Sequence, residues 1–117
     1  MTHTAKTMSE TKQSRIDALF QSYRESLPPL LAELETSWAA LQSEWNSDLA
    51  AEFDRKVHSL AGSSATFDLA EIGAVARELE HSFKPLLDTE YDLSNTQWSE
   101  SSQLLLKLKG LIESSQT

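Results

Sequence analysis

The sequence predicts an all-helical protein, an antiparallel up-down-up-down four-helix bundle with an additional short N-terminal helix. Apolar residues recur at three- and four-residue spacing along most of the chain, which is the spacing of one helical face. No segment shows the strict alternation of a half-buried strand, and the chain has only three glycines and no internal repeat. Short connections between amphipathic helices favour antiparallel neighbours, which is why a bundle is expected.

The N-terminal part is predicted to hold an arm and two helices. Residues 1–11 are polar and without periodicity, so we expect a disordered arm followed by one domain over residues 12–115. A first short helix should run from Ser14 to about Ser26. Pro28 and Pro29 are unsuited to a helix interior but favoured in a first turn, so they should start a second helix. Its buried stripe is Leu30, Leu31, Leu34, Trp38, Leu41 and Trp45.

A third helix is predicted over about residues 48–66. Asn46 or Ser47 can accept a hydrogen bond from its exposed amides, and Asp48 suits the positive end of its dipole. The stripe that should face the core is Leu49, Phe53, Val57, Leu60, Ser64 and Phe67.

Two further helices complete the predicted bundle. Asp68 and Glu71 approximate a capping box that opens the fourth helix, and Pro85 should end or kink it near its last turn. After a polar connection over residues 88–95, Ser94 and Gln97 can form a second capping box for the fifth helix. We expect the large aromatic residues of the chain, among them Trp38, Trp45 and Trp98, to belong to the core.

Composition narrows the class of function. The formal charge of −8 opposes binding to nucleic acid and to anionic membranes. Without cysteine there is no disulfide framework or thiolate metal site, and His3, His58 and His81 lie too far apart in sequence for a helical metal site. No apolar run approaches the roughly 20 residues of a membrane span, and no signal peptide is recognisable, so we expect a cytoplasmic monomer.

His58 is the candidate functional residue. On a helix it falls nearly opposite the buried stripe. Its neighbours one turn away are Asp54, Arg55, Ala61 and Gly62, and Ala65 lies two turns on. A glycine in a helix interior costs about 1 kcal/mol relative to alanine, so these small residues suggest that another surface must approach. A solvated surface histidine is the simpler interpretation from spacing alone, and a nucleophilic imidazole is the sharper one. Nothing nearby resembles a hydrolase nucleophile, and His81 lacks such small neighbours.

The run HSLAGSSATFDL, followed by LAEIGAVARELE, resembles the signature of histidine phosphotransfer (HPt) domains. The resemblance implies a four-helix bundle in which His58 accepts a phosphoryl group from a receiver-domain aspartate and passes it to another. It implies response-regulator receivers, and a hybrid sensor kinase, as partners. The chain would bind no cofactor and have no catalytic turnover of its own, because the receiver supplies Mg²⁺. Gly62 would let the receiver approach.

The chain departs from the family pattern at two positions. Many members have Lys where this chain has Ala61, so Arg55 or Lys84 could supply the missing cation. Asp68 stands where Gly is common, and because Asp tolerates unusual backbone angles we expect the turn to be retained. The alternative function is a non-transferring HPt-like adaptor or anti-regulator that binds a receiver or sensor-kinase domain, for which Ala61 is the main support.

Overall fold

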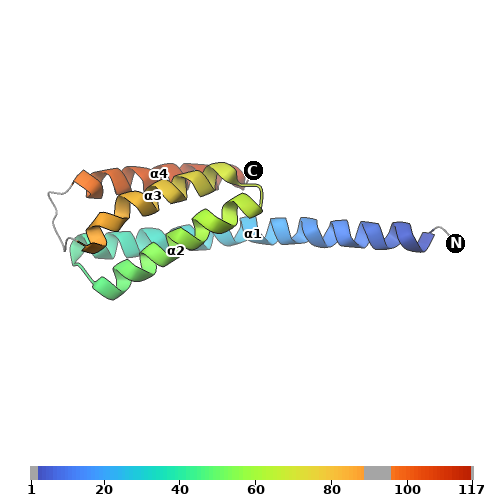
Figure 1. Ribbon diagram of the computed structural model, residues 1–117, viewed down its shortest axis with the longest axis horizontal. Coiled ribbons are helices and arrows are strands. Elements are labelled where there is room, and N and C mark those ends of the chain that lie inside the picture. The colour runs from blue at the N-terminus through green and yellow to red at the C-terminus, as the bar shows by residue number, and fades with distance from the viewer. Residues whose placement is uncertain (1–2, 89–95, 117) are drawn as a thin grey trace.

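Four helices build the described chain: α1 (His3–Ser43), α2 (Ser47–Thr66), α3 (Ala70–Asp88) and α4 (Thr96–Ser115). The computed structural model describes residues 3–88 and 96–116, with side chains from residue 11 onward. Successive helices run in opposite directions, with α1 against α2 and α4, and α3 against the same two helices (Figure 1). The described residues contain no strand, which confirms the predicted all-helical class.

The N-terminal half differs from the prediction, because one continuous helix replaces the two that were expected. The predicted break near Ser26 was wrong: Pro28 and Pro29 both lie inside α1, on its exposed face. Pro28 cannot donate to the carbonyl of Arg24, four residues earlier. That carbonyl instead accepts a hydrogen bond from the Gln116 side chain at 2.9 Å, so a residue beyond α4 replaces the lost donor.

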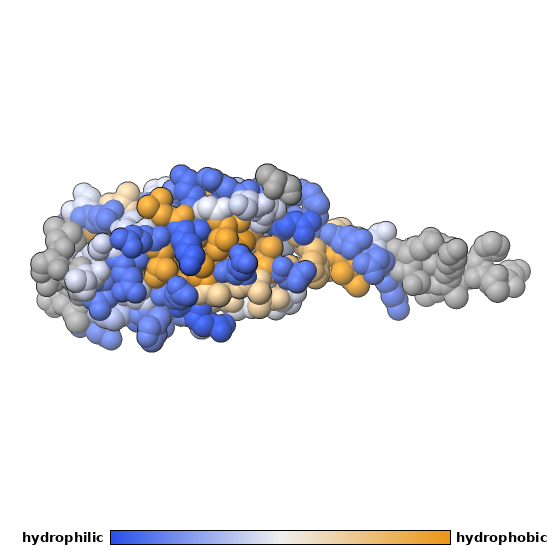
Figure 2. Space-filling view, turned by 90° about the horizontal axis from the view of Figure 1, so that it is seen from above, coloured by the Kyte–Doolittle hydropathy of each residue, from blue (hydrophilic) through white to orange (hydrophobic). Residues whose placement is uncertain are grey.

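The first half of α1 extends beyond the end of the bundle (Figure 1). The helix begins at His3, so the backbone is helical within the segment for which a disordered arm was predicted. Ile16 and Leu19 are 46% and 60% exposed there, and apolar surface continues from the bundle onto this protruding part (Figure 2). At its base Phe20 and Tyr23 pack against Phe67, with Tyr23 stacked at 4.3 Å between ring centroids.

An aromatic cluster fills the core at the other end of the bundle. Trp38 lies at the centre, within 6 Å of the rings of Phe53, Phe83 and Trp98. Its indole nitrogen donates a hydrogen bond to Ser102 on α4 at 3.0 Å. Trp38 and Trp98 are buried and Trp45 is half-buried, as expected of core residues.

Local signals fix the ends of α2. The Asn46 side chain accepts a hydrogen bond from the Leu49 amide at 3.0 Å, which confirms the predicted N-cap. Asp68 adopts a left-handed backbone with φ of 64°, so the expected turn is retained with Asp in place of Gly. Pro85 lies inside the last turn of α3, and Ser94 falls outside the described residues.

Within the described residues, no helix combines the length and the apolar character that crossing a bilayer requires.

Candidate functional site

His58 stands on the outer face of α2. Its side chain is 74% exposed, whereas Phe53, Val57 and Leu60 on the opposite stripe are at most 2% exposed. The helical pattern of α2 therefore places the imidazole in solvent, as predicted, on the side that leads to α3.

Glu80 on α3 forms a hydrogen bond with one nitrogen of the His58 imidazole. Its Oε2 atom lies 2.6 Å from the His58 Nδ1 atom, and the glutamate side chain is only 13% exposed. An ionised carboxylate can only accept, so the Nδ1–H group of His58 donates. In the neutral ring this leaves the lone pair on Nε2, which faces solvent. The contact thus fixes both the tautomer and the orientation of the ring.

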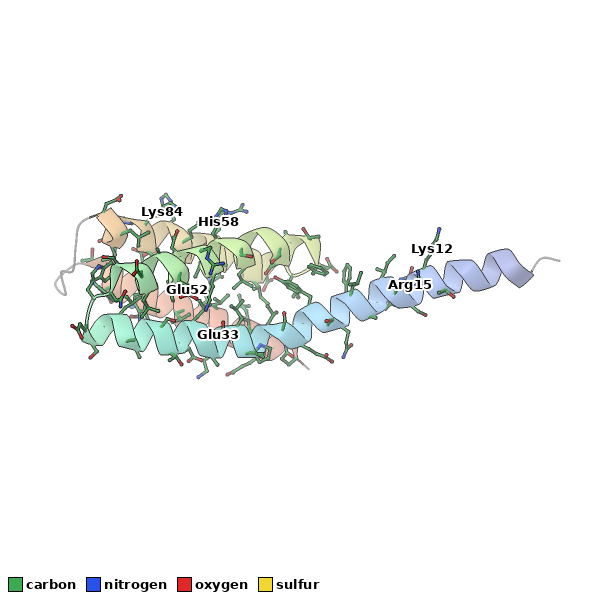
Figure 3. All side chains as sticks on the ribbon, turned by 90° about the horizontal axis from the view of Figure 1, so that it is seen from below. Lys12, Arg15, Glu33, Glu52, His58 and Lys84 are labelled. Carbon is green, nitrogen blue, oxygen red and sulfur yellow. The ribbon has the colours of Figure 1, made fainter. Side chains whose placement is uncertain are left out.

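Lys84 completes a short chain of charged contacts. Its Nζ atom lies 3.3 Å from the same Glu80 oxygen, one turn along α3. Figure 3 shows His58 and Lys84 projecting from neighbouring helices on the same side of the bundle. Arg55, the other cation considered, is 73% exposed and lies 4.0 Å from Glu52. Of the two cations, the structure joins Lys84 to the His58–Glu80 pair.

The small residues around His58 divide into two groups. Gly62 and Ala65 are exposed, but Ala61 is 3% exposed, so its predicted place on the open surface was wrong. Ala61 lies where α2 and α3 approach closely: a Cβ atom added at Gly73 would meet the Ala61 carbonyl oxygen at 3.2 Å. The position of α3 decides this burial, and a single-helix pattern does not reveal it.

Gly62 has no internal reason to be glycine. A Cβ atom added there would meet nothing within 4 Å, and its backbone is not left-handed. The residue therefore gives up about 1 kcal/mol of helix propensity without a packing gain inside the chain. This is the pattern expected where an approaching molecule needs room.

Asp54 lies one turn before His58, between α2 and α3. Its Oδ1 atom is buried and has no hydrogen-bond partner in the described part of the chain. Burial raises the pKa of this carboxyl group and Glu80 raises it further, whereas Lys84 and His58 act in the opposite direction. Asp54 thus belongs to the same charged cluster as the His58–Glu80 pair.

Ser63 and Ser64 point away from this cluster. Their hydroxyl groups lie 2.7 and 3.0 Å from the Tyr23 hydroxyl, which ties the end of α2 to α1. Ser64 is fully buried, as predicted for a packing residue. Neither serine is placed to act with His58 as a nucleophile. His81 is exposed and faces the groove between α3 and α4.

The sequence argument did not assign roles to Glu80 and Asp54. Glu80 comes from another helix, and its closeness to His58 depends on the register of α3 against α2. Asp54 was noted only as a neighbour of His58. Its position four residues before the histidine was the available signal, because such residues share one helical face.

Comparison with known families gives an independent result. A family model, described as the Hpt domain, matches residues 18–116. No curated protein and no solved structure matches the chain. The matched region includes most of α1 and all of α2, α3 and α4, and it contains every residue of the His58 cluster. The chain therefore belongs to the Hpt domain family, whose members carry phosphoryl groups on histidine in two-component signalling.

Proposed function

We propose that this chain relays a phosphoryl group between aspartates of receiver domains in a multistep two-component phosphorelay, with His58 as the carrier. The observation that carries the proposal is the contact between His58 Nδ1 and Glu80 at 2.6 Å, which leaves Nε2 exposed as a nucleophile. Family membership supports the same role, and the open space at Gly62 suits the approach of a receiver.

The transfer step follows from this geometry. The Nε2 lone pair attacks the phosphorus of a receiver phospho-aspartate, an N–P bond forms, and the P–O bond to the aspartate breaks. The aspartate leaves as a carboxylate with the bonding electron pair. The imidazole ring gains one positive charge, and its proton stays on Nδ1, where the Glu80 carboxylate balances that charge. The reverse sequence delivers the phosphoryl group to a second receiver.

The remaining parts of the reaction would come from the receiver. It would hold Mg²⁺, which neutralises charge on the transferring phosphoryl group. This chain would contribute the nucleophile, its orientation by Glu80, and the Lys84 ammonium group close by. We expect no catalytic turnover from the chain alone.

A transfer assay tests the proposal. Receiver domains of the source organism are phosphorylated with acetyl phosphate, mixed with this protein, and acid-labile label on the protein is followed. Wild type should become labelled by at least one receiver and His58→Gln should not. His81→Gln, which removes the other histidine of the bundle, should be labelled as wild type is. Equal labelling of His58→Gln and wild type would overturn the proposal.

The same assay separates the alternative function. A wild-type protein that binds a receiver but is never labelled by it would be a non-transferring adaptor. Binding is therefore measured alongside label, with His58→Gln as the matched variant. Loss of the single imidazole should abolish labelling while changing receiver affinity far less.

A further inference from the structure

Asp54 is a carboxylate beside the proposed phosphorylation site, and one of its two oxygens has no hydrogen-bond partner among the described residues. Its buried Oδ1 atom accepts no hydrogen bond from any described residue. Glu33 and Glu52, by contrast, both bind Lys56, at 3.2 and 3.3 Å. A buried carboxylate oxygen without a hydrogen bond costs stability, so its presence needs another explanation.

The charges around Asp54 all belong to the His58 cluster. His58 follows it by one turn on α2, and Glu80 and Lys84 face it from α3. Residues four apart on a helix have Cβ atoms roughly 5–6 Å apart, so the Asp54 and His58 side chains are neighbours. Glu80 and Lys84 contact one another, and Glu80 also contacts His58. Asp54, the other acid of this cluster, forms neither an ion pair with Lys84 nor a hydrogen bond with His58.

Phosphorylation would make the charge at His58 more negative, and the negative charge of Asp54 disfavours that change. A neutral ring carries no net charge. The phosphorylated ring carries one positive charge and its phosphoryl group two negative charges, so the net change is one negative charge. A neighbouring carboxylate in a partly buried setting repels that charge. The Glu80 carboxylate also repels the phosphoryl group, but the hydrogen bond that it accepts from Nδ1–H of the ring offsets this repulsion. The Asp54 Oδ1 atom accepts no such bond, so its repulsion is not offset in this way.

We infer that the negative charge of Asp54 destabilises the phosphorylated form of His58 and so favours transfer of the phosphoryl group to the next receiver. The inference rests on the proposed function, since it concerns the phosphorylated state of His58. In this role Asp54 acts through charge and touches no reacting atom.

The equilibrium between receiver and carrier is the appropriate measurement. This equilibrium compares free phospho-aspartate with free phosphohistidine, so a residue that only shapes the docked complex cannot move it. Asp54→Asn should shift the equilibrium towards phosphohistidine by roughly threefold to tenfold. Glu78→Gln, which removes one exposed charge from the other side of α3, should leave it close to wild type. Asp54→Glu, which keeps the charge, should restore the wild-type ratio.

The outcomes are distinguishable. If wild type accepts no phosphoryl group from any receiver, the proposed function fails. A second outcome is that wild type is labelled on His58 while Asp54→Asn shows the same equilibrium between receiver and carrier as the control Glu78→Gln. In that case only the inference about Asp54 fails. Circular dichroism checks that each variant is folded, and Asp54→Ala provides a second neutral variant. A shift in Asp54→Asn and Asp54→Ala alike, with none in Asp54→Glu, would support the inference.

Discussion

Glu80 is the residue on which the chemistry proposed for His58 depends most directly. It is nearly buried, it accepts the Nδ1–H group at 2.6 Å, and it is itself contacted by Lys84. A carboxylate in this position stabilises the positive ring that forms when Nε2 bonds to phosphorus. The arrangement is that of a nucleophile oriented by a neighbouring carboxylate, with the two groups supplied by different helices.

Glu80→Gln should therefore slow transfer without preventing it. The glutamine oxygen can still accept the Nδ1–H bond, but it cannot balance the charge of the phosphorylated ring. We expect the rate of transfer from the phosphorylated receiver to fall by about tenfold to a hundredfold, which is at or below the lower end of general acid–base effects because the hydrogen bond is kept. Rapid-quench measurement of label transfer tests this, with Glu78→Gln as the control. An unchanged rate in Glu80→Gln would show that the contact is incidental.

The sequence was sufficient to single out His58 but not to assemble its surroundings. Helical spacing placed His58, Gly62 and Ala65 on an exposed face, because these positions depend on one helix alone. Ala61 lies on the edge of that face, and the approach of α3 at Gly73 buries it. The role of Glu80 likewise depends on the register between two helices. Side-chain contacts between elements are the part that a single-helix pattern cannot provide.

The α2–α3 hairpin is the element that carries the site. Gly73 allows the two backbones to approach, with Ala61 and Ser64 on the facing side. Gly110, on α4, has no neighbour within 4 Å of an added Cβ atom. The two glycines therefore form a matched pair: both lie inside helices, but only one lies in a helix crossing.

Gly110→Ala should stabilise the protein and Gly73→Ala should not. Each substitution gains up to about 1 kcal/mol of helix propensity. At Gly73 the new Cβ atom would lie 3.2 Å from the Ala61 carbonyl oxygen, a backbone atom that moves only if α2 moves. Thermal unfolding should place the melting temperature of Gly110→Ala above that of wild type by up to about 4–8 °C, with that of Gly73→Ala at or below wild type. Equal stabilisation by both would show that the crossing is loose.

The helix boundaries show which sequence signals predicted the ends of helices correctly. Asn46 and Asp68 act through their own side chains and backbone, and both marked the ends of α2 correctly. The proline signal in α1 was misleading because Pro28 and Pro29 face solvent and Gln116 supplies a donor to the Arg24 carbonyl. That donor lies 92 residues away in the chain, so local sequence could not indicate it.

At the scale of the whole molecule, the protruding half of α1 sets the shape. The principal dimensions are 70 × 25 × 19 Å, and the radius of gyration of the Cα atoms is 18.0 Å. A compact domain of this length would have a radius of about 13 Å. The protein is therefore elongated, although its helical bundle is of ordinary size.

Small-angle X-ray scattering should return a radius of gyration close to 18 Å for the monomer. Forward scattering gives the mass and identifies the monomer. Deletion of residues 1–17, which precede the segment matched by the family model, should bring the radius towards about 13 Å. A radius near that value for the full-length monomer would mean that the N-terminal helix lies against the bundle in solution.

The hairpin also has a consequence for how the site forms. His58 and Glu80 are only 22 residues apart, on consecutive helices joined by a short turn. The entropy of closing so short a loop is small, so their contact can form as soon as α2 and α3 pair, before the distant ends of the chain meet. Local opening of α1 at its Gln116 contact would leave both residues in place. The proposed phosphorylation site would then be among the last parts of the molecule to lose its geometry.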